Sequence, residues 1–259
     1  MHLDIITLFP DMFSIVNNAG VIGRSCKNNI FNICTWNPRD FSDDKRKSVD
    51  DRPYGGGPGM VMKPIPLENT LNAVNKKRHL NGLHSSPVIL LTPIGNIFTQ
   101  EKAEKLSKTD GFIIICGRYE GIDKRFIDRF VTDEISIGDF IMSGGEIAAL
   151  ALIDSVIRLL PGALNNSNSI LYESFSDAND GLLEPYSYTR PYDYKGDYVP
   201  DVLLTGNHQK INIWRRKKAL EITMLRRPDL IEKARYNGLL SYDDEEIILN
   251  FLSSKKDYN

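Results

Sequence analysis

The feature that most constrains the fold is a regular alternation of short apolar runs with segments of helical periodicity. Apolar runs of this length, bounded by turn residues, are typical of buried strands. The runs lie at 3–9, 30–35, 87–91, 112–116 and 134–137, and the helical segments lie at 66–78, 99–107, 123–130 and 145–160. Thr99 is placed to cap the second of these helices. The alternation predicts an α/β fold with a mostly parallel sheet.

The charge balance excludes a polycation of the histone type, because the 32 Lys and Arg residues are outnumbered by 34 Asp and Glu residues. Nucleic acid remains open as a partner, since a local basic patch is enough to bind phosphates. Three cysteines without C-x-x-C spacing and four histidines without H-x-x-x-H spacing predict neither a zinc site nor a disulfide framework. No motif decides whether Mg²⁺ takes part.

The N-terminal residues lack the basic region of a signal peptide and include Asp4 and Pro10. The longest apolar stretch, 147–160, is interrupted by Asp154 and Arg158 and is too short to span a bilayer. We therefore expect a cytoplasmic protein.

Charge is segregated after residue 161. Residues 172–201 carry seven acidic and two basic side chains, whereas 205–228 carry seven basic side chains and one acidic side chain. The basic run 214–218 begins with Trp214, and such a run suits a phosphate backbone with a stacking surface. A solvated helix face is the alternative. The change in composition predicts a smaller, mainly helical second domain.

Three glycine-bearing loops follow the predicted strands, at 92–95, 117–121 and 136–145. Because ligands of parallel sheets bind beyond the carboxyl ends of the strands, these loops predict a pocket for a small organic molecule. The alternative is that each loop is only a tight turn. The glycines at 55–59 lie in a long aperiodic stretch, 36–60, and lack the context of a dinucleotide or phosphate loop. They suit a flexible loop that closes over a flat base or an RNA strand, with an ordered surface loop as the alternative.

Eight segments, in order along the chain, resemble the bacterial tRNA (guanine-N1)-methyltransferase (TrmD) family. They are LFPDMF (8–13), SVDDRPYGGGPGM (48–60), ICGRYEGID (115–123), SIGDFIMSGGE (136–146), IDSVIRLLPG (153–162), SYTRP (187–191), LLTGNH (203–208) and LRRPDL (225–230). The resemblance implies a SPOUT-class fold with a deep trefoil knot and a homodimer whose active sites are shared between chains. It also implies methylation of N1 of guanine 37 in tRNA, 3′ to the anticodon and preceded by G36, with S-adenosylmethionine as methyl donor.

The resemblance further assigns domains and site residues. The expected boundaries are 1–162 for a donor-binding domain, 163–180 for a flexible linker that carries the catalytic loop, and 181–259 for a helical tRNA-binding domain. The expected donor pocket comprises Leu91, Thr92, Pro93, Gly95, Gly117, Tyr119, Glu120, Gly121, Ile137, Gly138, Met142, Gly144 and Gly145. The expected contacts to tRNA and its anticodon stem-loop come from Asp50, Arg52, Gly55, Gly56, Gly57, Pro58, Gly59, Met60, Glu184, Asn207, His208, Trp214 and Arg215.

Removal of the N1 proton of guanine requires a general base, and a nearby arginine would stabilise charge on O6. Arg158 matches the family's arginine, although an arginine at a helix end can instead serve the terminal carbonyls. The family's base is an aspartate before Ser-Phe, whereas this chain has Glu173 there, and Glu184 replaces a second aspartate. About three extra residues lie near 177–180. We expect Glu173 to be the base, with Asp177 as the alternative. A non-catalytic RNA-binding relative would differ only at the two acidic positions, but it would not need the donor loops.

Overall fold

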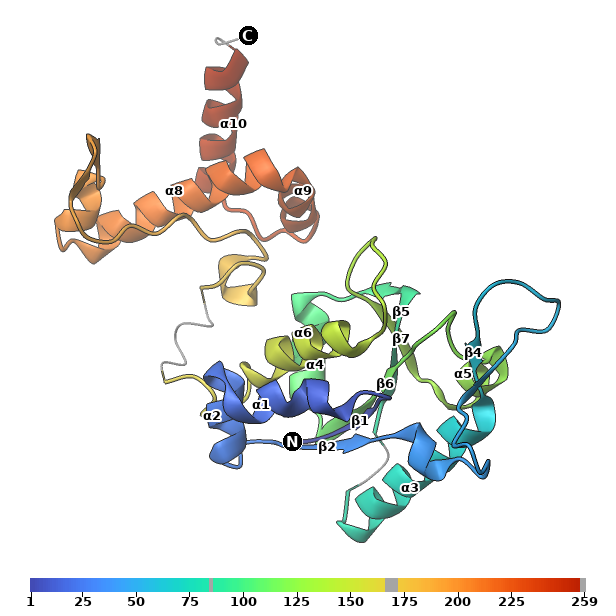
Figure 1. Cartoon of the computed structure of the whole chain (residues 1–259). Helices are drawn as coiled ribbons and strands as arrows, with labels where there is room; N and C mark the ends of the chain where they lie inside the picture. The colour runs from blue at the N-terminus through green and yellow to red at the C-terminus, as the bar shows by residue number, and fades with distance from the viewer. Residues whose placement is uncertain (84–85, 166–171, 257–259) are drawn as a thin grey trace. The chain divides into compact units, whose positions relative to one another are not determined.

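The computed structural model describes residues 1–83, 86–165 and 172–256, with the side chains of 254–256 left aside. The chain forms two compact units, Met1–Asn165 and Asn166–Asn259. Each is described by itself (Figure 1).

The first unit is built on a five-stranded sheet in the order β2-β1-β6-β5-β7. Its strands are β1 (His2–Ile6), β2 (Asn32–Trp36), β5 (Val88–Ile97), β6 (Gly111–Cys116) and β7 (Asp133–Ser136). Every pairing in this sheet is parallel, so the predicted α/β fold is confirmed. β6 lies between β1 and β5 and is buried along its whole length, as its unbroken apolar sequence predicts.

Helices cover both faces of the sheet (Figure 1). They are α1 (Ser14–Asn18), α2 (Gly20–Lys27), α3 (Pro64–Leu80), α4 (Gln100–Ser107), α5 (Lys124–Phe130) and α6 (Glu146–Ile157), with short 3-10 helices η1 (Pro10–Phe13) and η2 (Pro38–Phe41). Along β6, Ile114 belongs to the cluster that contains α6, and Ile113 to the cluster that contains α3. This alternation gives the unit two cores, one on each side of the sheet. The predicted cap is confirmed, because the Thr99 hydroxyl accepts a hydrogen bond from the Lys102 amide.

The prediction that 92–95 is a loop beyond a strand is wrong. β5 continues to Ile97, and its ladder with β7 shifts register between Leu91 and Asn96. Residues 92–95 therefore form a bulge within the strand rather than a connection to α4. The bulge brings Gly95 so close to β7 that a Cβ there would lie 2.4 Å from the carbonyl carbon of Glu134. Only glycine fits at residue 95, because any side chain there would collide with the backbone of β7.

The second unit is mainly helical. It contains η3 (Asp177–Asn179), the hairpin β8 (Asp193–Tyr194) and β9 (Asp197–Tyr198), η4 (Asp201–Leu204), α8 (His208–Arg226), α9 (Pro228–Tyr236) and α10 (Tyr242–Lys256). Its core is formed by Leu182, Leu220, Ile231, Ala234 and Ile248. No helix within the described ranges has both the length and the apolarity needed to cross a membrane.

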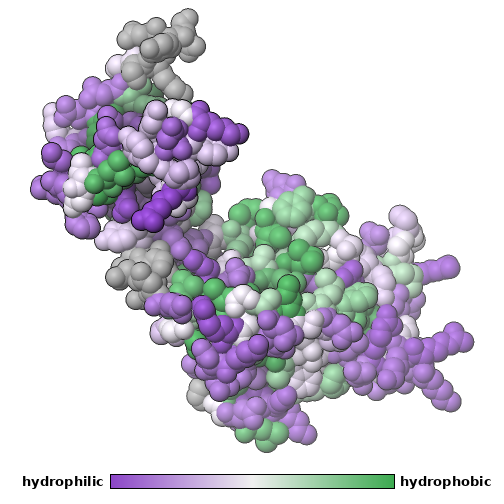
Figure 2. All heavy atoms as spheres, turned by 60° about the vertical axis from the view of Figure 1, so that its left-hand side comes forward, coloured by the Kyte–Doolittle hydropathy of each residue, from purple (hydrophilic) through white to green (hydrophobic). Residues whose placement is uncertain are grey.

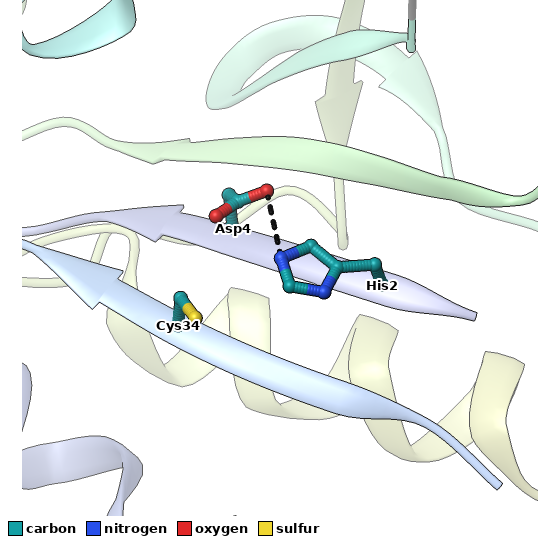
Figure 3. Close-up of side chains that lie close together, drawn as sticks. All are labelled: His2, Asp4 and Cys34. Atoms are coloured by element: carbon teal, nitrogen blue, oxygen red, sulfur yellow. Dashed lines mark ion pairs between the residues drawn. The ribbon is translucent and has the colours of Figure 1, made fainter. Parts of the chain in front are cut away.

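A buried ion pair fastens β1 to α3. The Asp4 carboxylate accepts hydrogen bonds from Arg78 at 2.6 Å and from the Trp36 indole at 2.8 Å. His2 lies 3.4 Å from the same carboxylate, as the dashed line in Figure 3 marks. Burial raises the pKa of Asp4, but hydrogen bonds from His2, Arg78 and Trp36 outweigh it and hold the pKa below its ordinary value of 3.8. The carboxylate therefore stabilises the fold in its charged form.

Asp4→Asn is expected to lower the free energy of unfolding by about 3–5 kcal/mol near pH 7, because it leaves the buried Arg78 without a counter-charge. A group with a lowered pKa stabilises fully above its unfolded-state pKa, and it loses that contribution as the pH falls through the folded-state pKa. The difference between wild type and variant should thus shrink below about pH 4. Urea unfolding at several pH values measures it. Asp40→Asn is the control, since its ion pair with Lys47 is exposed. Equal losses in the two variants would contradict this account.

Candidate active site

Three loops meet at the carboxyl edge of the sheet because β6, β5 and β7 are neighbours. Leu91 of β5 lies beside Cys116 of β6 on one side and beside Ile135 of β7 on the other. The bulge 92–95 and the loops that begin at residues 117 and 137 therefore start at the same level. This edge carries all the residues predicted for the donor pocket, namely Leu91, Thr92, Pro93, Gly95, Gly117, Tyr119, Glu120, Gly121, Ile137, Gly138, Met142, Gly144 and Gly145.

The loops after β6 and β7 pack backbone against backbone. The amide of Gly145 donates a hydrogen bond to the carbonyl of Gly117 at 3.0 Å. A Cβ at Gly145 would lie 2.9 Å from the Cα of Cys116, so a larger residue would separate the loops. Burial, and then the charge of Glu146, raise the pKa of the Cys116 thiol well above its ordinary value. Cys116 is therefore a packing residue and not a nucleophile.

A buried charged network fixes these two loops. Glu146 begins α6 and is fully buried, and its Oε1 accepts a hydrogen bond from the Thr7 hydroxyl at 2.9 Å. Its Oε2 lies 2.9 Å from Nη2 of Arg118, whose Nη1 donates to the carbonyl of Ser143 at 3.0 Å. The guanidinium also lies over the ring of Phe9. Arg118 thus joins the loop after β6 to the loop that leads into α6.

Sequence reasoning missed this network. Arg118 and Glu146 both stand in the motifs that carry the family resemblance, at 115–123 and 136–146. Their opposite charges are compatible with an ion pair, but residues so far apart in the sequence cannot be paired without the structure.

The loop 48–60 is joined to the loop after β6. The carbonyl of Met60 accepts a hydrogen bond from the Glu120 amide at 2.9 Å, and the Met62 amide donates to the carbonyl of Gly121 at 2.9 Å. Asp50 lies in β3 (Asp50–Asp51), which pairs with β4 (Val61–Met62). The predicted RNA contacts Arg52, Gly55, Gly56, Gly57, Pro58 and Gly59 are exposed, and Met60 is half-buried. An exposed loop of predicted RNA contacts therefore adjoins the predicted donor loops.

The residues predicted for proton transfer lie in different units. Arg158 follows the last turn of α6, where its amide donates to the carbonyl of Asp154 at 3.2 Å. Glu173 is half-buried in the second unit, and its carbonyl accepts a hydrogen bond from the Ser176 amide. Arg158 and Glu173 each take part in a further interaction in the structure.

The segment after Glu173 forms a hydrogen-bonded turn. The amide of Phe175 donates to the carbonyl of Leu182 at 2.9 Å, and the amide of Glu184 donates to the Ser174 hydroxyl at 3.0 Å. Asp180 forms an ion pair with Arg216 at 2.9 Å, whereas Asp177 is exposed at the start of η3. Of the predicted linker 163–180, residues 166–171 lie outside the described residues.

The basic run of the second unit is partly committed to its fold. Arg216 binds both carboxylate oxygens of Asp244, and these hydrogen bonds raise the pKa of Arg216. Lys218 pairs with Glu221 at 2.6 Å. Among the predicted contacts, Asn207 caps α8 by accepting from the Lys210 amide. His208 and Arg215 are exposed, and so is Glu184, whereas Trp214 is half-buried.

One group of possible metal ligands lies within the described residues, formed by His2, Asp4 and Cys34 on β1 and β2 (Figure 3). Their donor atoms lie within 4.8 Å of one another. Both carboxylate oxygens of Asp4 are already bonded, Oδ1 to Trp36 and Oδ2 to Arg78. A guanidinium beside the carboxylate opposes a second cation, so Asp4 serves the ion pair with Arg78. The Cys34 thiol instead accepts a hydrogen bond from Lys77.

The first unit is an α/β fold with three loops at the carboxyl edge of a parallel sheet, where ligands of such sheets generally bind, and it is followed by a helical unit with a basic helix. Residues 1–233 match the family described as tRNA (guanine-1)-methyltransferase TrmD. The chain belongs to this family. Its fold class is SPOUT, and the trefoil knot stays a prediction.

Curated relatives agree over nearly the whole length. The tRNA (guanine-N(1)-)-methyltransferase of Bordetella parapertussis is 51% identical over 256 residues, which cover 99% of this chain and 100% of the relative. The protein of the same name from Polynucleobacter asymbioticus is 50% identical, with 96% and 99% covered. That from Burkholderia ambifaria is 48% identical, with 99% and 96% covered.

Glu146→Gln is expected to cost about 3–5 kcal/mol of unfolding free energy, because Arg118 loses its buried counter-charge. Arg118→Met in the same chain should recover a large part of that loss, since it removes the charge that Glu146→Gln leaves without a counter-charge. Chemical unfolding of both single variants and the double variant measures the coupling. Glu101→Gln, at an exposed pair with Lys105, is the control. Additive losses at Glu146 and Arg118 would show that the pair does not act as one unit.

Proposed function

We propose that this protein transfers the methyl group of S-adenosylmethionine to N1 of guanine 37 in tRNA, 3′ to the anticodon and preceded by G36. The observation that carries the proposal is the hydrogen bond from the Glu120 amide to the carbonyl of Met60, at the end of the loop 48–60. The Met62 amide, two residues further on, reinforces it by donating to the carbonyl of Gly121. These hydrogen bonds hold the loop assigned to the guanine against the loop assigned to the donor. Membership in the family supports the same reaction.

The residues at the sheet edge fit the chemistry of the donor. Ile137 and Met142 are partly buried against the core and offer an apolar surface for a flat adenine. The exposed Tyr119 and Glu120 offer a hydroxyl and a carboxylate for the donor's polar and cationic groups. When bound, S-adenosylmethionine supplies an electrophilic methyl group on a sulfonium that is its own leaving group.

The protein must therefore position the guanine and remove a proton. Guanine N1 carries a hydrogen, and its lone pair becomes available only when a base accepts that proton. We assign this role to the carboxylate of Glu173, and we assign stabilisation of the charge on O6 to Arg158. Glutamate and aspartate have similar unperturbed pKa values, so the exchange of the family's aspartate preserves the chemistry. Glutamate is one methylene longer than aspartate, so the backbone of the turn 173–184 must lie further from the guanine to place the carboxylate at N1.

The proposal extends to partners and location. The tRNA anticodon stem-loop is held by the second unit through Asn207, His208, Trp214 and Arg215, and two copies of the chain share their active sites. Exposed apolar side chains at Phe140, Ile141 and Ile147 support a subunit interface near the start of α6. Figure 2 shows apolar surface gathered on the first unit. The reaction takes place in the cytoplasm, where unmodified tRNA is present.

Glu173→Gln is expected to slow single-turnover methylation by about a hundredfold or more, the usual contribution of a general base. Asp177→Asn, at an exposed carboxylate four residues after Glu173, should stay within a few-fold of wild type. The measurement is transfer of labelled methyl from S-adenosylmethionine to unmodified tRNA with guanine at position 37. If Asp177→Asn abolishes transfer and Glu173→Gln does not, the base is misassigned.

The wild-type enzyme should leave the same tRNA unlabelled when guanine 37 is replaced by another base. Label in that substrate would contradict the specificity. Tight tRNA binding without any transfer would identify a non-catalytic RNA-binding relative instead.

A further inference from the structure

The second unit contains a small cavity of about 170 Å³ between α8 and the segment 183–192. Trp214, Lys218 and Glu221 line it from α8, where their spacing of four and three residues places them on one helical face. Tyr186 and Tyr188 line it from the segment. Two elements far apart in sequence thus bring three aromatic side chains to one hollow.

The cavity has the chemistry of a site for one flat ring. The rings of Tyr188 and Trp214 have centroids 6.2 Å apart and are inclined by 59°, so they form two walls rather than a closed stack. Lys218 and Glu221, joined at 2.6 Å, bring a cation and a carboxylate to the same lining. The volume lies below the range of pockets for whole cofactors or drug-sized molecules. A single heterocycle with donors and acceptors on its edge suits these walls.

The segment that carries Tyr186 and Tyr188 is attached to α8 by a hydrogen bond. Leu182 is fully buried in the core of the second unit, and the next amide, that of Leu183, donates to the buried Thr223 hydroxyl of α8 at 3.0 Å. The segment therefore leaves the core at a fixed point on α8 just before Tyr186. This hydrogen bond fixes the position of the segment, so the cavity is part of the folded structure of the second unit.

Positive charge stands beside the aromatic walls. Lys210 lies one helical turn before Trp214, and Arg215 is adjacent to it in sequence, with both side chains exposed. Within the described part of the chain, no ion pair engages either of them. Cations beside an aromatic pocket suit a nucleotide, whose phosphate and base bind to the two kinds of group.

We infer that this cavity receives one unstacked nucleobase of the anticodon arm, other than the guanine that is methylated. The inference rests on the proposed function, because it takes tRNA as the substrate. The proposed function assigns the methylated guanine to the donor loops of the first unit, so the cavity is assigned to another base of the anticodon arm.

The test measures the affinity of the full-length protein for an anticodon stem-loop RNA, intact and with each loop position made abasic in turn. Tyr188→Leu and Trp214→Leu remove a stacking ring and should weaken binding about tenfold or more. Tyr188→Phe keeps the ring and should bind like wild type. Tyr194→Leu, an exposed tyrosine of the β8–β9 hairpin that does not line the cavity, is the matched control and should also bind like wild type.

One abasic position should weaken wild-type binding by a similar factor, and with that RNA the leucine variants should cause no further loss. Folded leucine variants that bind like wild type, or losses that add to every abasic change, would overturn the inference. So would a shift of the variants to a different oligomeric state in sedimentation, which would assign the cavity to contact between copies. Wild-type methyl transfer to the same RNA is scored separately, because its absence refutes the proposed function and not the cavity.

Discussion

The buried ion pair between Arg118 and Glu146 is the interaction on which the geometry of the candidate site depends. Two charges inside the protein are stable only when they are paired and hydrogen-bonded. Glu146 and Arg118 are paired at 2.9 Å, with the Thr7 hydroxyl and the Ser143 carbonyl as further partners, and the pair joins the loop after β6 to the first turn of α6. The pair therefore sets the spacing of two of the three loops. The same two loops are also joined by the hydrogen bond from the Gly145 amide to the carbonyl of Gly117.

The surfaces proposed to bind RNA are built differently. The loop 48–60 is tied to the loop 117–121 near Met60, but its glycines and Tyr54 are exposed. In the second unit, Arg216 and Lys218 are engaged in ion pairs, whereas Lys210 and Arg215 are exposed. The loops assigned to the donor are thus held by an ion pair and hydrogen bonds, and the surfaces assigned to tRNA present side chains to solvent. Such a division suits a small donor of fixed shape and a large, adaptable nucleic acid.

Much of the fold could be predicted from the sequence, because strand and helix periodicities are local properties. The unbroken apolar run of β6 and the cap at Thr99 are of this kind. The continuation of β5 to Ile97 could not be predicted, since a proline and a glycine within residues 92–95 indicate a turn, and only the approach of β7 draws the chain back into the sheet. The pairing of Arg118 with Glu146 and the cavity beside Trp214 depend on contacts between distant segments. The assignment of the donor residues came from the family motifs, and the sheet topology supplies the physical reason why those motifs lie together.

Hydrogen–deuterium exchange with S-adenosylmethionine alone tests the central claim most directly. The account predicts slower exchange in 91–95, 117–121 and 137–145 upon donor binding, with little change in α8, α9 and α10. Slower exchange confined to the opposite edge of the sheet would contradict it. There a cavity of about 760 Å³ is lined by His2, Asn32 and Asp110.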